Sequence, residues 1–388
     1  MTRAVVLVLD GVGAGEMPDA DSYGDAGSDT LGNLASAVGG LDLPNLQRMG
    51  LGNLHRLQGV PPSPDPAAAW GRMAELSSGK DSTTGHWEMM GLQLAQPFPT
   101  FRTGFPPKVI EEISRRTGRG VICNRPASGT EIIEELGPRH RKTGELIVYT
   151  SADSVLQIAA HEKVVPREEL YDACLAAREI MQPPGLGVAR VIARPFVGEP
   201  GDYTRTAGRR DFSLEPTGRT LLDALAEAGI PRTGVGKIDD LFAHRSISTE
   251  HVPDNGRGLE VLSRQISEVG SGLIFANLVD FDMRWGHRND VEGFRRGLEQ
   301  VDAALPGLVS LLRPGEVFII TADHGNDPTT PSTDHSREYV PLLCHVPGGR
   351  AVDLGLRETF SDVACTLAAH FGLDETFPGT SFLEEVRP

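Results

Sequence analysis

Cysteine is scarce in this chain, and its few copies lie far apart. The four cysteines, Cys123, Cys174, Cys344 and Cys365, include no Cys-x-x-Cys pair. A disulfide framework and a thiolate zinc site are therefore both disfavoured, and we expect a cytoplasmic protein in a reducing compartment. Any metal bound by this chain must be held by oxygen and nitrogen ligands.

Long hydrophobic runs and an excess of positive charge are also absent. The only apolar run near the amino terminus, residues 4–9, ends at Asp10, far short of a secretory signal or of the roughly 20 residues that span a bilayer. Lys and Arg number 37 against 53 Asp and Glu, a net charge of −16. We therefore expect no membrane and no nucleic acid as partner. No amphipathic or aromatic patch indicates an obligate protein partner.

The composition favours a globular α/β protein. With 388 residues, 39% of them hydrophobic, the chain can form two domains or one core with a large insertion. Short β-branched runs alternate with amphipathic segments, as in α/β folds. The segments expected to form helices over a sheet are 220–228, 258–269, 294–312 (interrupted near Pro306) and 360–371.

One stretch has secondary structure of its own. Residues 97–212 include predicted strands at 145–150 and 188–193 and helices near 110–116 and 167–181, between borders rich in proline and glycine. We therefore predict a metal-binding core domain of residues 1–96 and 213–388, with residues 97–212 as an inserted α/β domain.

Three apolar runs lead into acidic residues: 4–9 into Asp10, 272–279 into Asp282, and 316–321 into Asp323. Ligands of open α/β sheets bind beyond the carboxyl ends of strands, so these groups are expected to converge. With nearby histidines they form a set of six candidate metal ligands: Asp10, Asp282, His287, Asp323, His324 and His335. One divalent cation usually takes three or four protein ligands, so six groups indicate two cations. Oxygen and nitrogen donors favour Mn, Zn or Fe without distinguishing among them.

The segment 79–88 (GKDSTTGHWE) places the hydroxyls of Ser82, Thr83 and Thr84 at the start of an expected helix. One interpretation is an ordinary helix N-cap. The other is a nucleophilic hydroxyl at a helix N-terminus, where backbone N–H groups favour phosphate. A hydroxyl is nearly inert at pH 7, so it would need the metal that the Asp/His set supplies.

Together these motifs resemble the phosphopentomutase family of the alkaline phosphatase superfamily. The similar segments are 10–13 (DGVG), 80–88 (KDSTTGHWE), 277–287 (NLVDFD, then WGH), 321–327 (TADHGND), 149–155 (YTSADSV) and 193–200 (ARPFVGEP). The resemblance implies an α/β fold: an alkaline-phosphatase-like sandwich with a central, mostly parallel sheet covered by helices, plus an inserted α/β cap domain.

The resemblance also implies a role for each residue. The family's nucleophile is the Thr directly before Gly-His, which is Thr84 here. One cation would be held by Asp10, Asp323 and His324 and the other by Asp282, His287 and His335, with manganese the usual ion. The residues assigned to the sugar are Ser151, Asp153 and the backbone near Val155, and those assigned to the distal phosphate are Arg190 and Lys237, with Arg194 and Arg205 as further candidates.

The implied activity is that of an isomerase acting on a small pentose phosphate. A phosphothreonine at position 84 would interconvert α-D-ribose 1-phosphate and D-ribose 5-phosphate, and the 2-deoxyribose equivalents, through a 1,5-bisphosphate. Ribose 1,5-bisphosphate or glucose 1,6-bisphosphate would activate the enzyme. The inserted domain would act as a lid that keeps water from the phosphoenzyme.

Other functions stay open on the sequence. A metal-dependent phosphatase would release phosphate rather than isomerise its substrate. A cofactor-independent phosphoglycerate mutase usually has a serine nucleophile and a longer chain, which Thr84 and the 388 residues disfavour. A non-catalytic binding protein on the same scaffold would be expected to lack a ligand or the nucleophile, and none of these positions is missing.

Overall fold

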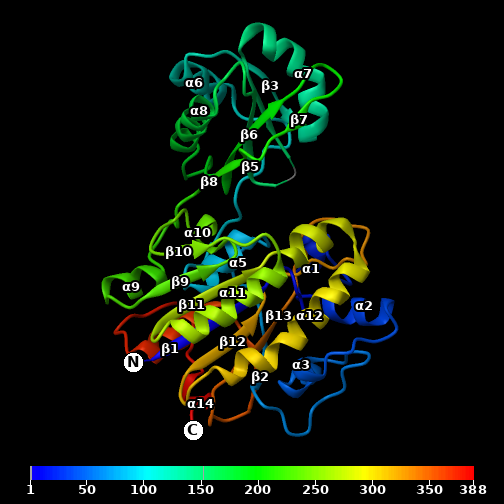
Figure 1. Cartoon of the computed structure of the whole chain (residues 1–388), viewed down its shortest axis with the longest axis vertical. Coiled ribbons are helices and arrows are strands. Elements are labelled where there is room, and N and C mark those ends of the chain that lie inside the picture. The colour runs from blue at the N-terminus through cyan, green and yellow to red at the C-terminus, as the bar shows by residue number, and fades with distance from the viewer. Residues whose placement is uncertain (1, 152) are drawn as a thin grey trace. The chain divides into compact units, whose positions relative to one another are not determined.

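The computed structural model describes residues 2–151 and 153–388. Met1, in the predicted core domain, and Ala152, in the segment 149–155, lie outside the described residues. The chain forms two compact units, Met1–Pro97 with Gly218–Pro388, and Phe98–Thr217, which we call the core unit and the inserted unit (Figure 1). Within the described residues, no helix combines the length and the apolar character needed to span a bilayer.

The core unit is built on an eight-stranded sheet. In spatial order its strands are β10 (Ser248–Glu250), β9 (Arg232–Val235), β11 (Gly272–Leu278), β1 (Arg3–Leu9), β12 (Val317–Thr321), β13 (Val340–His345), β2 (Ala69–Met73) and β14 (Asp353–Arg357). Every adjacent pair is parallel except the two that involve β13, which is antiparallel to both β12 and β2. The predicted mostly parallel central sheet is confirmed.

The sequence of the central strand β1 explains its position between β11 and β12. All seven of its residues are buried, as expected for an apolar strand covered on both faces. It pairs in parallel with β11 and β12, so that Val8 lies opposite both Asn277 and Thr321. The carboxyl ends of these three strands therefore meet at one edge of the sheet.

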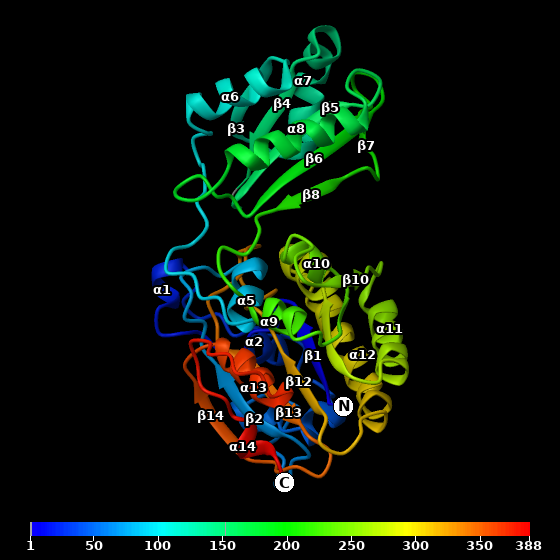
Figure 2. The same ribbon diagram turned by 90° about the vertical axis from the view of Figure 1, so that its left-hand side faces the viewer.

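Helices cover both faces of this sheet. On one face α11 (Asn255–Glu268) packs with α12 (Val291–Ser310), while α5 (Ser82–Met89), α9 (Leu221–Glu227) and α13 (Ser361–Phe371) lie on the other (Figure 2). The shorter elements are α1 (Ala20–Tyr23), α2 (Thr30–Ala37), α3 (Pro44–Arg48), α4 (Leu51–Leu54), α10 (Ile238–Leu241), α14 (Leu383–Val386), the π-helical turn η1 (Phe281–Trp285) and the 3-10 turn η2 (Gly286–Arg288). The predicted helix-covered sandwich is confirmed.

Helix α12 continues through Pro306, so the interruption expected there is wrong. Proline has no N–H and leaves the carbonyl four residues earlier without its helical donor. Here that carbonyl belongs to Asp302, and it accepts a hydrogen bond of 3.1 Å from Asn45 Nδ2 in α3. The neighbouring helix thus supplies the donor that Pro306 lacks.

The inserted unit is a smaller α/β sandwich. Its sheet runs β3 (Val121–Pro126), β4 (Leu146–Thr150), β5 (Val155–His161), β6 (Arg190–Val197) and β7 (Thr204–Arg205), and β8 (Arg210–Ser213) also pairs with β6. Alternate residues of β4 belong to opposite cores. Leu146 and Val148 pack with α6 (Pro107–Thr117) and α8 (Arg167–Ile180), whereas Ile147 and Tyr149 pack with α7 (Gly129–Thr143).

Candidate metal centre

The six Asp and His residues predicted as metal ligands converge beyond the strand ends of the core sheet. Asp10 follows β1, Asp282 lies in η1 after β11, and Asp323 follows β12 by two residues. One group joins Asp282, His287 and His335, and another joins Asp10, Asp282 and His324, each with ligand atoms within 4.8 Å of one another. Asp282 belongs to both groups, so the set forms one continuous site.

The distances within this site fit metal coordination. Asp282 Oδ2 is 3.2 Å from His287 Nε2, and its Oδ1 is 3.3 Å from His335 Nε2. On the other side, His324 Nε2 is 3.4 Å from Asp10 Oδ1 and 3.5 Å from Asp323 Oδ2. Ligand atoms at 2.0–2.2 Å from one tetrahedral ion stand about 3.3–3.6 Å apart. Five of the six predicted donors therefore lie in groups that could hold a cation, whereas Asp323 belongs to neither group, and its Oδ2 lies 3.1 Å from His86 Nδ1.

The electrostatics of the site also favour a cation. Burial acts to lower the pKa of His287, but the adjacent Asp282 outweighs it and raises that pKa to about 9. Burial acts to raise the pKa of Asp282, yet His335 and His287 hold it well below its ordinary value. The pKa of His324 is raised well above its usual range, because Asp323 and Asp10 outweigh burial. The buried carboxylates thus stabilise positive charge at this site.

Two asparagines that we did not predict orient the carboxylates. Asn277 Nδ2 donates to Asp10 Oδ2 at 2.9 Å, and Asn326 Nδ2 donates to Asp282 Oδ1 at 2.7 Å. Such partners fix the direction of a ligand and are part of a metal site. The only sequence signal for them is their place inside the motifs NLVDFD and ADHGND.

The structure brings Ser82, rather than Thr84, to this site. Ser82 Oγ lies 3.1 Å from His324 Nε2 and 3.5 Å from Asp10 Oδ1. The Thr84 hydroxyl instead donates to Asp81 Oδ2 at 2.6 Å, in a fully buried side chain. A Cβ atom added to Gly79 would stand 2.4 Å from Thr84 Oγ1, so the backbone closes over that hydroxyl.

The amino end of α5 has an ordinary N-cap, and the cap is Asp81. Its Oδ1 accepts hydrogen bonds of 3.1 Å from the amides of Thr83 and Thr84. Both amides are occupied, so the expectation that free N–H groups of this helix receive phosphate is not supported at these two residues.

The predicted sugar-binding residues of the inserted unit lie near one end of its sheet. Val155 begins β5 and pairs with Arg190, the first residue of β6. Ser151 and Asp153 lie between β4 and β5, and the Asp153 carbonyl accepts a hydrogen bond of 2.9 Å from the Val155 amide. Lys237 belongs to the core unit, where its Nζ lies 3.3 Å from Met283 Sδ.

Arginines gather around β6 of the inserted unit. Burial and then the charges of Arg209 and Arg205 lower the pKa of Arg194. One carboxylate, Asp211, accepts a hydrogen bond of 2.7 Å from Arg209 and stands 3.6 Å from Arg190. Three arginines, Arg190, Arg194 and Arg209, act on the single carboxylate of Asp211, so the local potential is positive. Local potential rather than net charge attracts an anionic substrate.

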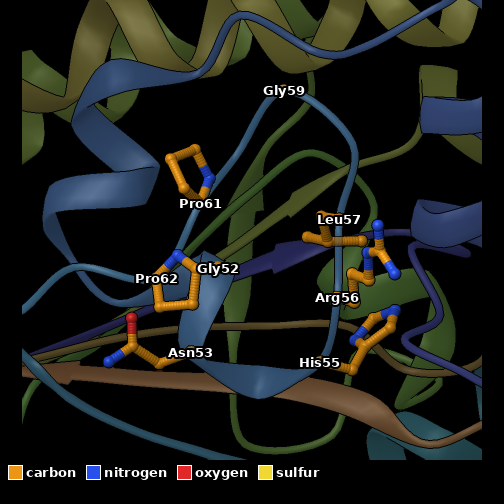
Figure 3. Close-up of a pocket in the computed structure, with 8 residues that line it drawn as sticks. All are labelled: Gly52, Asn53, His55, Arg56, Leu57, Gly59, Pro61 and Pro62. Carbon is orange, nitrogen blue, oxygen red and sulfur yellow. The ribbon is translucent and has the colours of Figure 1, made fainter.

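A cavity of about 460 Å³ lies in the core unit (Figure 3). It is lined by Gly52, Asn53, His55, Arg56, Leu57, Gly59, Pro61 and Pro62. None of the predicted site residues lines this cavity, and none of its lining residues is acidic. It therefore offers no alternative metal centre.

Comparison with known proteins agrees with this geometry. A family model described as the metalloenzyme superfamily matches residues 2–375. The chain is 57% identical over 386 residues to a phosphopentomutase of Anaeromyxobacter sp. (strain K), covering 99% of each chain. It is 56% identical over 390 residues to that of Kosmotoga olearia, again covering 99% of each. The chain belongs to the phosphopentomutase family. The predicted family, the isomerase class and the binding of divalent metal are thereby confirmed.

The phosphopentomutase fold also resembles a solved structure of low sequence identity. The PH0037 protein from Pyrococcus horikoshii is 14% identical, with a TM-score of 0.51 over 97% of this chain and 99% of that one. At this identity the likeness concerns the fold alone.

Proposed function

We propose that this chain interconverts α-D-ribose 1-phosphate and D-ribose 5-phosphate, and the 2-deoxyribose equivalents, through a phosphorylated enzyme. The observation that carries the proposal is the position of Ser82 Oγ, 3.1 Å from His324 Nε2 and 3.5 Å from Asp10 Oδ1. This places a hydroxyl among groups suited to divalent cations. The name shared by the relatives, phosphopentomutase, supports the substrate class.

We assign the nucleophile to Ser82 in place of Thr84. A phosphoryl group on Thr84 would have to displace the Asp81 carboxylate and the backbone at Gly79, both of which enclose the Thr84 hydroxyl. Ser82 has a partly exposed side chain and needs no such rearrangement.

We assign Asp10, Asp323 and His324 to one divalent cation and Asp282, His287 and His335 to the other, with Mn²⁺ as the expected ion. When bound, such cations favour the deprotonated nucleophile and neutralise charge on the transferring phosphoryl group. Asn277 and Asn326 keep the Asp10 and Asp282 carboxylates in place.

The reaction is a pair of phosphoryl transfers at one serine. In the resting enzyme Ser82 carries the phosphoryl group. The bond from phosphorus to Ser82 Oγ breaks, a bond to the sugar hydroxyl oxygen forms, and the proton of that hydroxyl passes to Ser82 Oγ. The other phosphate of the 1,5-bisphosphate then returns to Ser82, which gives net isomerisation. Ribose 1,5-bisphosphate or glucose 1,6-bisphosphate phosphorylates Ser82 in unmodified enzyme.

The inserted unit is assigned the sugar contacts at Ser151, Asp153 and the backbone near Val155, and a distal-phosphate contact at Arg190. Lys237 of the core unit is assigned to the same phosphate. The positive potential around β6 supports a phosphate-binding role for the inserted unit. We also assign this unit the exclusion of water, because an exposed phosphoenzyme would hydrolyse.

A coupled assay tests the proposal. Ribose 1-phosphate is supplied with Mn²⁺ and a catalytic amount of glucose 1,6-bisphosphate, and ribose 5-phosphate and free phosphate are both measured. Isomerisation with little phosphate release is the expected result. Phosphate release without isomerisation would indicate a phosphatase, and neither product would indicate a non-catalytic binding protein.

A further inference from the structure

We propose that the core unit carries another metal site, formed by Asp239, Asp240, His244 and His251, for a transition-metal dication such as Zn²⁺. None of these residues belongs to the metal centre described above. The inference does not depend on the proposed reaction.

The distances among these side chains resemble those of the metal centre. His251 Nε2 is 2.9 Å from Asp239 Oδ1, and His244 Nδ1 is 3.3 Å from Asp239 Oδ2. Asp240 lies 3.8 Å from His244 Nε2 and 4.0 Å from His251 Nδ1. Asp239, Asp240 and His251 each offer a ligand atom within 4.8 Å of the others. His244 lies outside this group of three and reaches it through Asp239. Because a histidine offers one ring nitrogen to an ion, the relevant distances are those from Asp239 to the two rings, 2.9 and 3.3 Å. They are close to the separation of about 3.3–3.6 Å between ligands of one tetrahedral ion.

Three segments of the chain are tied together to form this cluster. Asp239 and Asp240 lie in α10, His244 lies in the following turn, and His251 directly follows β10. The Asp239 amide donates to Thr249 Oγ1 at 2.9 Å, and the His244 amide donates to the Asp239 carbonyl at 2.7 Å. These two hydrogen bonds connect α10 to β10 and to the following turn without an ion.

The chemistry of the donors points to a transition metal. Two of the four side chains are imidazoles. The cluster therefore differs from the groups of acidic side chains that are common on protein surfaces. The Asp239 side chain is only 9% exposed, whereas the His244 and His251 rings are 63% and 50% exposed, so an ion can reach a nearly buried carboxylate from solvent. Imidazole with carboxylate suits Zn²⁺, Cu²⁺ or Ni²⁺, whereas Mg²⁺ and Ca²⁺ prefer all-oxygen sites.

Ion pairing alone explains the arrangement less well. Both rings are at least half exposed, and ion pairs between exposed side chains typically stabilise a fold by only about 0–1 kcal/mol. One dication bound by neutral imidazoles satisfies both rings and both carboxylates. Asp239 follows Lys237 by two residues, so the ion would also anchor the segment that carries this lysine.

Zinc stoichiometry tests the inference on the full-length chain. The unaltered protein, the double variant His244→Gln/His251→Gln and the control His55→Gln are equilibrated with micromolar free Zn²⁺, and bound zinc per chain is measured. His55 is a suitable control because it lies 3.1 Å from Asp29 Oδ1 but belongs to no described group of three donors. We expect one zinc fewer per chain in the double variant only. Equal zinc in all three proteins would overturn the proposal.

A second measurement uses the unaltered protein and so does not depend on how a variant folds. Crystals grown with Zn²⁺ are measured on both sides of the zinc absorption edge. An anomalous peak between Asp239 and His251 is expected, and peaks confined to the metal centre would refute the additional site.

Discussion

The Ser82 hydroxyl oxygen lies 3.1 Å from His324 Nε2, whereas the Thr84 hydroxyl, two residues later, donates to Asp81. Successive residues of an α-helix are rotated by about 100°, so positions two apart point in nearly opposite directions. Ser82 therefore faces the metal centre, whereas Thr84 is buried and bonded to Asp81, the N-cap of α5.

Replacing Ser82 by alanine is expected to abolish isomerisation. The proposed phosphoryl acceptor is lost while the metal ligands remain, so we expect activity to fall by at least about a thousandfold with both cations retained. The rate of ribose 5-phosphate formation and the metal content of the variant are measured together. Normal turnover would show that Ser82 is not the nucleophile.

Thr84→Val is the matched variant. It keeps the shape of a buried side chain and removes the hydrogen bond to Asp81, so we expect a loss of about 1 kcal/mol in the free energy of unfolding with catalysis preserved. Loss of phosphoenzyme in Thr84→Val but not in Ser82→Ala would restore Thr84 as the nucleophile.

Removing the His335 imidazole is expected to weaken one cation site selectively. His335 contacts Asp282 and belongs to the group with His287, not to the group with Asp10 and His324. Metal analysis after dialysis should find about one tightly bound ion fewer in His335→Ala, and no change in the control His345→Ala. An unchanged metal content would remove His335 from the ligand set.

The two arginines of β6 are expected to differ in their effect on substrate affinity. Arg190 adjoins Val155 in the sheet, whereas the Arg194 Nε donates to Gln157 Oε1 at 3.0 Å. Hydrogen bonds to charged groups contribute about 1.5–3 kcal/mol, so Arg190→Gln should raise the KM for ribose 5-phosphate by about 10- to 100-fold. A larger increase for Arg194→Gln than for Arg190→Gln would assign the distal phosphate to Arg194.

Protein stability is expected to depend on pH through Glu338. Burial raises the pKa of this carboxyl from 4.5 to about 7, although it accepts hydrogen bonds from Thr30 and Ser336. Between these pH values the folded state holds a proton that the unfolded state has lost. The contribution of Glu338 to stability is therefore complete below pH 4.5 and is lost as the pH rises to about 7.

The variant Glu338→Gln isolates this effect. By linkage the total change is about 3 kcal/mol, and glutamine cannot titrate. Denaturant unfolding of both proteins at pH 5 to 8, at constant metal concentration, should show the variant gaining stability relative to the unaltered protein as the pH rises. A difference between the two proteins that is independent of pH would contradict the raised pKa.

The support that α3 gives to the proline of α12 can be measured with a double-mutant cycle. Asn45→Ala leaves the buried Asp302 carbonyl without its donor and should cost about 1–3 kcal/mol of unfolding free energy. Pro306→Ala restores a helical N–H to that carbonyl, so Asn45→Ala should cost less in the Pro306→Ala background. Strictly additive effects would show that the two residues are independent.

Much of the fold follows from local patterns in the chain. The buried strands β1, β11 and β12 are continuous apolar runs, which strands covered on both faces require. The acids that follow them were predicted as metal ligands because parallel strands end at a common edge. Strand β2 and the edge strand β14 have no such pattern and were not predicted, since their pairing depends on distant segments.

Local sequence patterns did not predict which hydroxyl, that of Ser82 or that of Thr84, lies at the metal centre. The preference for Thr84 rests on the resemblance, and the exclusion of a phosphoglycerate mutase depends in part on the same threonine. With the nucleophile assigned to Ser82, the threonine no longer distinguishes the two families. The sequence identity to phosphopentomutases decides the family instead.

The sequence by itself determined the fold class and the family and predicted the six candidate donors of the metal centre, because strand-end residues and short motifs are local properties. Only the tertiary structure decided that Ser82 faces this centre, that Asn277 and Asn326 orient its carboxylates, and that Asp239 and His251 meet elsewhere. These relations depend on where a helix is capped and on how segments far apart in the chain pack together. No local pattern of residues encodes that packing.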